Sequence, residues 1–144
     1  MSRIINIENA GKERSHLVKM IVLAIRELST KSEPGPESRD LVSFIILSLT
    51  LISKSIDLTV EAWEKRGYWV KADHFRMEWV WTEKYGENLL ATLLASDWDG
   101  IVRNIAQIAQ KLNKVTIPTR NRMGTPWVGA WKILKGKKEN SLPN

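Results

Sequence analysis

The most constraining feature of the sequence is an apolar segment near its middle, at residues 41–60 (LVSFIILSLTLISKSIDLTV). Over its first four turns, apolar side chains fall on nearly every side of a helical projection, so no continuous polar face remains. Lys54 and Asp57 interrupt the segment, and five Ser or Thr residues precede Asp57. This pattern favours a buried core helix over a membrane-spanning one. We therefore expect residues 39–66 to form the central helix of a bundle, with its hydroxyl side chains bonded to its own carbonyls and no membrane association.

Helical periodicity continues on both sides of this segment. Residues 8–31 carry apolar side chains at helical spacing, and a Ser-Glu-Pro-Gly-Pro break at 32–36 separates them from the central helix. Lys65 and Arg66 followed by Gly67 predict the end of the central helix, since cations and a left-handed glycine are typical of the last turn.

Downstream of Gly67, the same reasoning predicts three more helices. Lys84 and Gly86 repeat the C-terminal signal, which indicates an aromatic helix that starts at Tyr68 and ends before Gly86. Apolar residues at 89–94 and 98–112 then predict two helices, the second of them capped by Ser96. We expect these two helices to stack almost coaxially.

The sequence thus predicts an all-α fold, a bundle of four to five helices with an irregular C-terminal arm. Residues 1–114 are expected to form the helical bundle domain. Residues 115–144 are expected to form a basic arm that packs on the same domain and frays at its end, because prolines and glycines interrupt any period there. The alternative is an α+β fold with a short strand pair at 75–81 and 127–134, since alternate residues from Phe75 to Trp81 are aromatic or Met. The helical interpretation is favoured because residues 71–77 are rich in helix formers.

Four of the seven tryptophans lie between Trp63 and Tyr85. In a helical projection of about 100° per residue, one face of this stretch is expected to meet the core, and it consists of Tyr68, Ala72, Phe75 and Trp79. Met77 and Trp81 lie nearly opposite that face, with Trp69 on one flank. One small chain is not expected to cover both faces. We therefore predict a homo-oligomer whose partner interface includes Trp69, Met77 and Trp81, and a non-enzymatic helical interaction or assembly module as the function.

The positive charge of the chain is concentrated in its last third. The net charge is +6, and residues 101–144 carry nine Lys or Arg against one acid, Glu139. Cations neutralise phosphates and tryptophan faces accept unstacked bases, so the alternative function is binding of a polyanion such as single-stranded nucleic acid. The residues predicted for this role are Arg120, Arg122, Trp127, Trp131, Lys132, Lys135, Lys137 and Lys138.

Motifs for catalysis and cofactor binding are absent from the sequence. The lack of cysteine excludes disulfides, zinc ribbons and thiol catalysis, and it favours a cytoplasmic location together with an N-terminus that lacks the pattern of a secretory signal. No phosphate-binding glycine loop or nucleophile-elbow pattern occurs, so we predict no catalytic residues and no cofactor. His74 and Glu78 stand four residues apart and are weak metal-ligand candidates, since a carboxylate-type metal bundle needs two Glu-x-x-His pairs.

Overall fold

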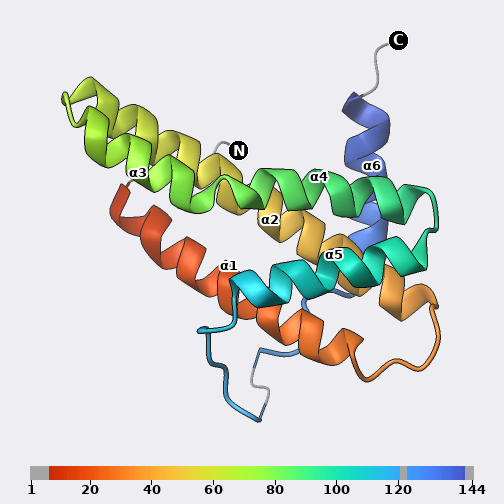
Figure 1. Ribbon diagram of the computed structural model, residues 1–144. Coiled ribbons are helices and arrows are strands. Elements are labelled where there is room, and N and C mark those ends of the chain that lie inside the picture. The colour runs from red at the N-terminus through yellow and green to blue at the C-terminus, as the bar shows by residue number, and fades with distance from the viewer. Residues whose placement is uncertain (1–6, 121–122, 142–144) are drawn as a thin grey trace.

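The computed structural model describes residues 7–120 and 123–141, which form six α-helices (Figure 1). The helices are α1 (Ile7–Leu28), α2 (Pro36–Lys65), α3 (Trp69–Trp79), α4 (Trp81–Leu94), α5 (Trp98–Lys111) and α6 (Ala130–Ser141). Helices α1, α3, α4 and α6 all pack against α2, whereas α5 packs mainly against α4. The predicted all-α bundle is confirmed. The alternative strand pair is not formed, because residues 75–79 lie in α3 and residues 130–134 lie in α6.

Helix α2 is the central helix, as its apolar composition predicts. It begins one turn earlier than expected, because Pro36 occupies the first helical position, where its fixed φ and missing N–H cost nothing. Two of its buried hydroxyl side chains bond to the helix itself: Ser43 donates to the Arg39 carbonyl (2.7 Å) and Ser55 to the Ile52 carbonyl (2.9 Å). By length and composition alone α2 is able to cross a membrane, but 56% of its most apolar window is buried inside the bundle. Core helices of soluble proteins pass the same test, so this is weak support for a membrane span, and the compartment stays a prediction.

The turns after α2 and α4 have the same hydrogen-bond pattern. After α2, Gly67 has a φ of +82°, its N–H donates to the Glu64 carbonyl, and the next N–H donates to the Trp63 carbonyl. This is the Schellman arrangement that the Lys-Arg-Gly sequence predicts. After α4, Ser96 takes the left-handed position with a φ of +53°, and Asp97, not Ser96, caps α5 by accepting a hydrogen bond from the Gly100 N–H (3.0 Å). The chain therefore reverses direction here, and α5 lies alongside α4 (Figure 1) instead of stacking coaxially with it.

Helices α3 and α4 are joined through Val80 alone and together form one bent rod (Figure 1). The Thr82 hydroxyl donates to the Trp79 carbonyl (2.8 Å), and a side chain that bonds to its own helix in this way commonly bends it. The predicted helix end at Gly86 is wrong. Gly86 lies inside α4, where a Cβ would stand 3.5 Å from the Cβ of Leu49, so this glycine allows α4 and α2 to approach closely.

The C-terminal arm is more ordered than its sequence suggests. Residues 115–120 and 123–129 are irregular, but α6 follows and packs on α2. The Asp40 carboxylate accepts hydrogen bonds from the N–H groups of Gly129 (3.1 Å) and Trp131 (2.9 Å), and the guanidinium of Arg39 lies over the Trp131 ring (5.4 Å). Trp127 is buried in the core beneath this contact. The expected division at residue 114 stays a prediction, and the expected fraying of residues 142–144 lies outside the described residues.

Candidate functional site

Helix α3 and the end of α2 project beyond the rest of the bundle as a helical hairpin (Figure 1). Along α3 and at Val80 directly after it, four apolar side chains are exposed, and they fall within about a third of a turn in helical projection. We call them the α3 stripe: Trp69 (63% exposed), Val70 (74%), Met77 (67%) and Val80 (51%). Solvated apolar side chains that cluster in this way mark an interaction site more often than isolated ones do.

The opposite side of α3 is fixed on α2. Ala72 is fully buried, and Phe75 and Trp79 are partly buried against the core, as predicted. The Arg76 guanidinium ties the helices together by pairing with the Glu64 carboxylate of α2 (3.2 Å). Tyr68 is the exception: it is exposed, because it precedes the first helical residue and does not follow the helical projection. The α3 stripe is therefore presented by a helix whose other face is anchored.

Trp81 does not share the exposed face of Trp69 and Met77. It belongs to α4, beyond the bend at Val80, and it packs partly buried against the core. Its ring stacks on Trp79 with a centroid distance of 6.3 Å and an interplanar angle of 21°. The expected orientation of Trp81 is therefore wrong, because the projection assumed one straight helix. The interface role of Trp69 and Met77 stays a prediction. Val70 and Val80 are exposed on the same side and are added to the candidate interface.

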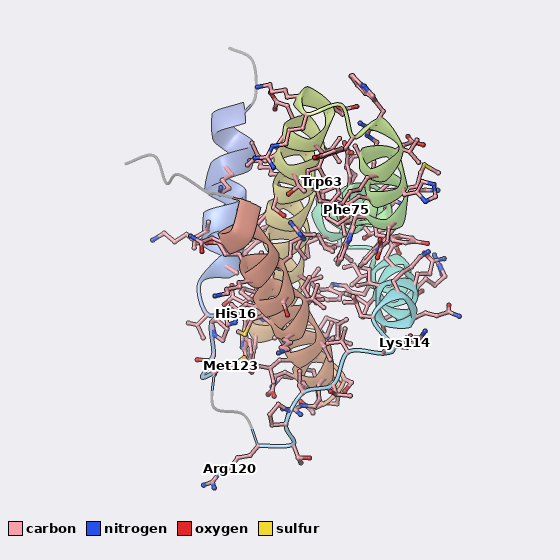
Figure 2. All side chains as sticks on the ribbon, turned by 90° about the vertical axis from the view of Figure 1, so that its left-hand side faces the viewer. His16, Trp63, Phe75, Lys114, Arg120 and Met123 are labelled. Carbon is pink, nitrogen blue, oxygen red and sulfur yellow. The ribbon has the colours of Figure 1, made fainter. Side chains whose placement is uncertain are left out.

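A row of aromatic rings and cations runs along the side of α3 that faces α1. Figure 2 shows Trp63 and Phe75 beside each other between α2 and α3, with ring centroids 5.0 Å apart. The Lys71 ammonium lies 4.4 Å from the Trp63 ring centroid, and the Arg14 guanidinium lies 5.0 Å from that of Phe75. Each cation is attracted by the negative face of the ring that it covers. The row thus joins α1, α2 and α3 through contacts that no sequence motif indicates.

Arg14 extends from α1 into a cleft of about 390 Å³ on this side of the hairpin. Its guanidinium donates one hydrogen bond, to the Ser55 hydroxyl of α2 (3.3 Å), and within the described ranges 7–120 and 123–141 no carboxylate lies within ion-pair distance of it. Partial burial lowers the pKa of Arg14 from its ordinary value. No sequence pattern marks Arg14 as a site residue, because a single Arg on an amphipathic helix is common.

The weak metal candidates His74 and Glu78 are both exposed on α3. They line one side of an open cavity of about 610 Å³ together with Trp63, Lys71 and Phe75. Among the residues that the structure describes, no group of three or more His, Asp or Glu side chains is placed to hold a metal ion. A third ligand for His74 and Glu78 is therefore not present in this part of the chain.

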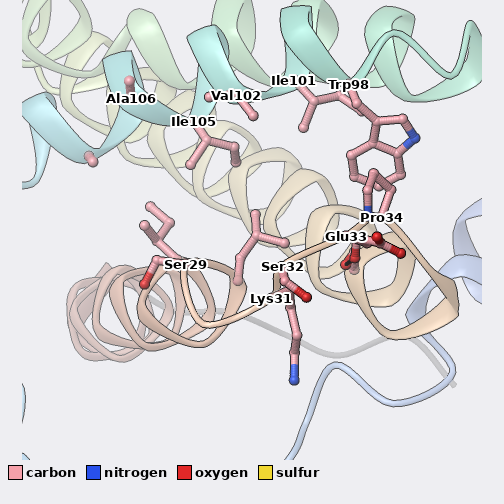
Figure 3. Close-up of a pocket in the computed structure, with 14 residues that line it drawn as sticks. Ser29, Lys31, Ser32, Glu33, Pro34, Trp98, Ile101, Val102, Ile105 and Ala106 are labelled. Carbon is pink, nitrogen blue, oxygen red and sulfur yellow. Dashed lines mark hydrogen bonds between the residues drawn. The ribbon is translucent and has the colours of Figure 1, made fainter.

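A second cavity, of about 430 Å³, lies between α1, α5 and the loop that joins α1 to α2 (Figure 3). Its α5 wall is apolar, and it consists of Trp98, Ile101, Val102, Ile105, Ala106 and Ala109. Ile25 and Leu28 of α1 form the facing wall, while Lys31 points away from α5 and pairs with Glu37 (3.0 Å). The size and lining are those of a site for a small apolar molecule. No signal in the sequence pointed to it, because the walls come from segments about 75 residues apart.

The residues predicted to bind a polyanion differ in exposure: the described cations are exposed, whereas the two tryptophans are buried or partly buried. Lys132, Lys135 and Lys137 are exposed on α6, and Arg120 is exposed in the preceding arm. Trp127 is only 2% exposed, and Trp131 is partly buried with Arg39 over its ring, so neither offers a free face to a base. Arg122 and the side chain of Lys138 lie outside the described part of the structure. The polyanion role stays a prediction that depends on the cations alone.

Comparison of the chain with models of protein families, with curated proteins and with solved structures gives no match.

Proposed function

We propose that this protein is a non-enzymatic interaction module that self-associates through the α3 stripe. The observation that carries the proposal is the exposure of Trp69, Val70, Met77 and Val80 on one side of a projecting, anchored helix. Removal of such side chains from water is the main favourable contribution to association. A second copy of the chain is the partner, because two identical stripes pair around a twofold axis without any further component.

The arrangement of α3 supports pairing between helices. Asp73 projects within the stripe, between Trp69 and Met77, and its carboxylate pairs with Arg76 (3.3 Å), which also pairs with Glu64 of α2 (3.2 Å). His74 is exposed on one flank of the stripe, and Arg76 lies on the other. A contact through the stripe would combine four apolar side chains with one carboxylate that already has a cationic partner, so Asp73 need not be left unpaired in the interface. Trp69 is expected to contribute the largest share of the binding free energy, because tryptophan is strongly enriched among the residues that dominate interfaces.

The proposal is tested by sedimentation velocity over a wide range of protein concentrations. The wild-type protein is expected to form a dimer or larger oligomer as concentration rises. Met77→Glu is expected to weaken association by about tenfold or more, because the new carboxylate must be buried without a partner. A matched control is Ile133→Glu, which changes another exposed apolar residue (55% against 67% for Met77) on α6, at the other end of the molecule (Figure 1).

Two results would contradict self-association through α3. One is a wild-type protein that stays monomeric at the highest concentration measured. The other is a loss of association in Ile133→Glu that equals the loss in Met77→Glu, because this would assign the contact to another surface. Circular dichroism of both variants checks that the helices are retained.

A second candidate function is polyanion binding by α6, supported by the exposure of Lys132, Lys135 and Lys137 on that helix. Binding through these groups would consist of contacts with phosphates, so the affinity for single-stranded RNA should fall steeply with salt and vary little with sequence. The triple change of these lysines to Gln is expected to remove binding in a mobility-shift assay at low salt. Absence of any shift with the wild-type protein would exclude this function.

A further inference from the structure

Arg14 occupies a position that is unusual for a charged side chain. It is half-buried between α1, α2 and α3, and its pKa is lowered by burial alone. A guanidinium has five N–H donors, and only one hydrogen bond, to Ser55, uses them within the described residues. The guanidinium also lies over the Phe75 ring at 5.0 Å, and no carboxylate of the described residues is within ion-pair distance of it. The remaining donors of Arg14 are therefore available to an anion.

The space around Arg14 admits a ligand. The cleft has a volume of about 390 Å³, and Phe75 and Trp79 of α3 form its apolar wall. Gly11 lies one turn before Arg14 on α1, and a Cβ at this position would meet only Nη2 of Arg14, at 3.8 Å. The missing side chain at residue 11 thus leaves one edge of the guanidinium open to the cleft.

The charges in the cleft select the kind of anion. Glu78 lines the same space, so a doubly charged anion such as phosphate would be repelled more strongly than a single carboxylate. The planar guanidinium matches a carboxylate with two parallel hydrogen bonds. The Phe75 and Trp79 rings favour a ligand whose body is apolar or aromatic.

We infer that the cleft between α1 and α3 is a binding site for a small monocarboxylate with an apolar or aromatic body, held at its charged end by Arg14. The carboxylate accepts hydrogen bonds from the free edge of the guanidinium, and the body of the ligand lies against Phe75 and Trp79. This site is separate from the α3 stripe, so it stands whether or not the protein self-associates.

The test uses 3-phenylpropionate as a probe and follows the amide and Arg14 Nε–H resonances of the full-length, nitrogen-15-labelled protein. Saturable shifts centred on Gly11, Arg14 and Phe75 are expected. The uncharged 3-phenylpropionamide is expected to bind at least about tenfold more weakly, since it lacks the charge-assisted hydrogen bonds. Equal affinity for the amide, or phosphate shifts as strong as those with the carboxylate, would overturn the assignment.

Two variants separate a binding role of Arg14 from a structural one. Arg14→Gln is expected to weaken binding of the probe by about tenfold or more. Gly11→Leu retains the charge, keeps good helix propensity and covers the open edge, so it is expected to weaken binding with no loss of thermal stability. Lys12→Ala is the matched control, because it removes an exposed cation from the same turn and should leave the affinity unchanged. Retention of full affinity in Gly11→Leu, or its loss in Lys12→Ala, would refute the site.

Discussion

Asp40 at the start of α2 accepts a hydrogen bond from the main-chain N–H of Trp131, 91 residues away, at 2.9 Å. The second oxygen of its carboxylate accepts from the Gly129 N–H (3.1 Å), so one side chain bonds two N–H groups at the entrance to α6. Carboxylates favour this position because the first N–H groups of a helix lack partners within it. Asp40 thus acts as a cap supplied by a different helix.

Replacement of Asp40 by Ala is expected to lower the free energy of unfolding by about 1 to 3 kcal/mol, since two N–H groups lose a charged partner. Urea denaturation measures the loss. Hydrogen exchange locates it: amides of α6 should exchange faster in Asp40→Ala, while those of α5 change only as much as global stability does. An α6 with unchanged protection would show that Trp127 alone holds this helix in place.

Gly100, in the first turn of α5, is expected to tolerate no side chain. An added Cβ would lie 2.8 Å from Cγ2 of Thr92 and would collide with the Asp97 carboxylate that caps the helix. Gly100→Ala should therefore destabilise the protein by about 1 to 3 kcal/mol, measured by urea denaturation. Gly136→Ala is the matched control: it lies in α6 with no atom within 4 Å of the added Cβ, and it should stabilise by about 0.5 to 1 kcal/mol. Equal effects of the two changes would contradict the crowded environment of Gly100.

The two Schellman turns provide a reciprocal pair of substitutions. Ser96 has a φ of +53° and Gly67 a φ of +82°, but only glycine adopts this region without steric cost. Ser96→Gly is expected to raise the melting temperature, with a gain of about 1 kcal/mol, and Gly67→Ala is expected to lower stability by a similar amount. Calorimetry on the two variants checks both signs. A destabilised Ser96→Gly would indicate that the serine hydroxyl makes a contact that outweighs the strain.

The accuracy of the sequence predictions follows from how local each signal is. The central helix and its end at Gly67 were predictable, because apolar coverage and a left-handed glycine are encoded within a few residues. The prediction of a helix end at Gly86 is wrong, because a glycine is needed there for close contact with Leu49 of α2. The residues next to Gly86 in the sequence give no sign of this contact. The inward turn of Trp81 follows from the bend at Val80, where α3 ends and α4 begins, and a straight helical projection does not include such a bend.

The candidate sites were less predictable than the fold. The exposure of Trp69 and Met77 was predictable, because an aromatic helix with two apolar faces is visible in one stretch of sequence, and their interface role stays a prediction. The Arg14 cleft and the cavity beside α5 depend on helices from distant parts of the chain that come together only in the folded state. Helical periodicity describes the face of one element and contains no information about which element covers it.

Trp127 offers a test that separates its structural role from a role in nucleic-acid binding. Its ring is 2% exposed, and its Nε1–H has no hydrogen-bond partner among the described residues. Trp127→Ala should therefore cost about 3 to 5 kcal/mol through the cavity that it leaves, whereas Trp127→Phe removes no hydrogen bond and should cost about 1 to 2 kcal/mol. Because the enclosed ring has no face for a base, Trp127→Phe should bind single-stranded RNA as the wild type does in a mobility-shift assay. A tenfold loss of RNA affinity in Trp127→Phe at unchanged melting temperature would contradict this, since it would require the ring to leave the core and stack on a base.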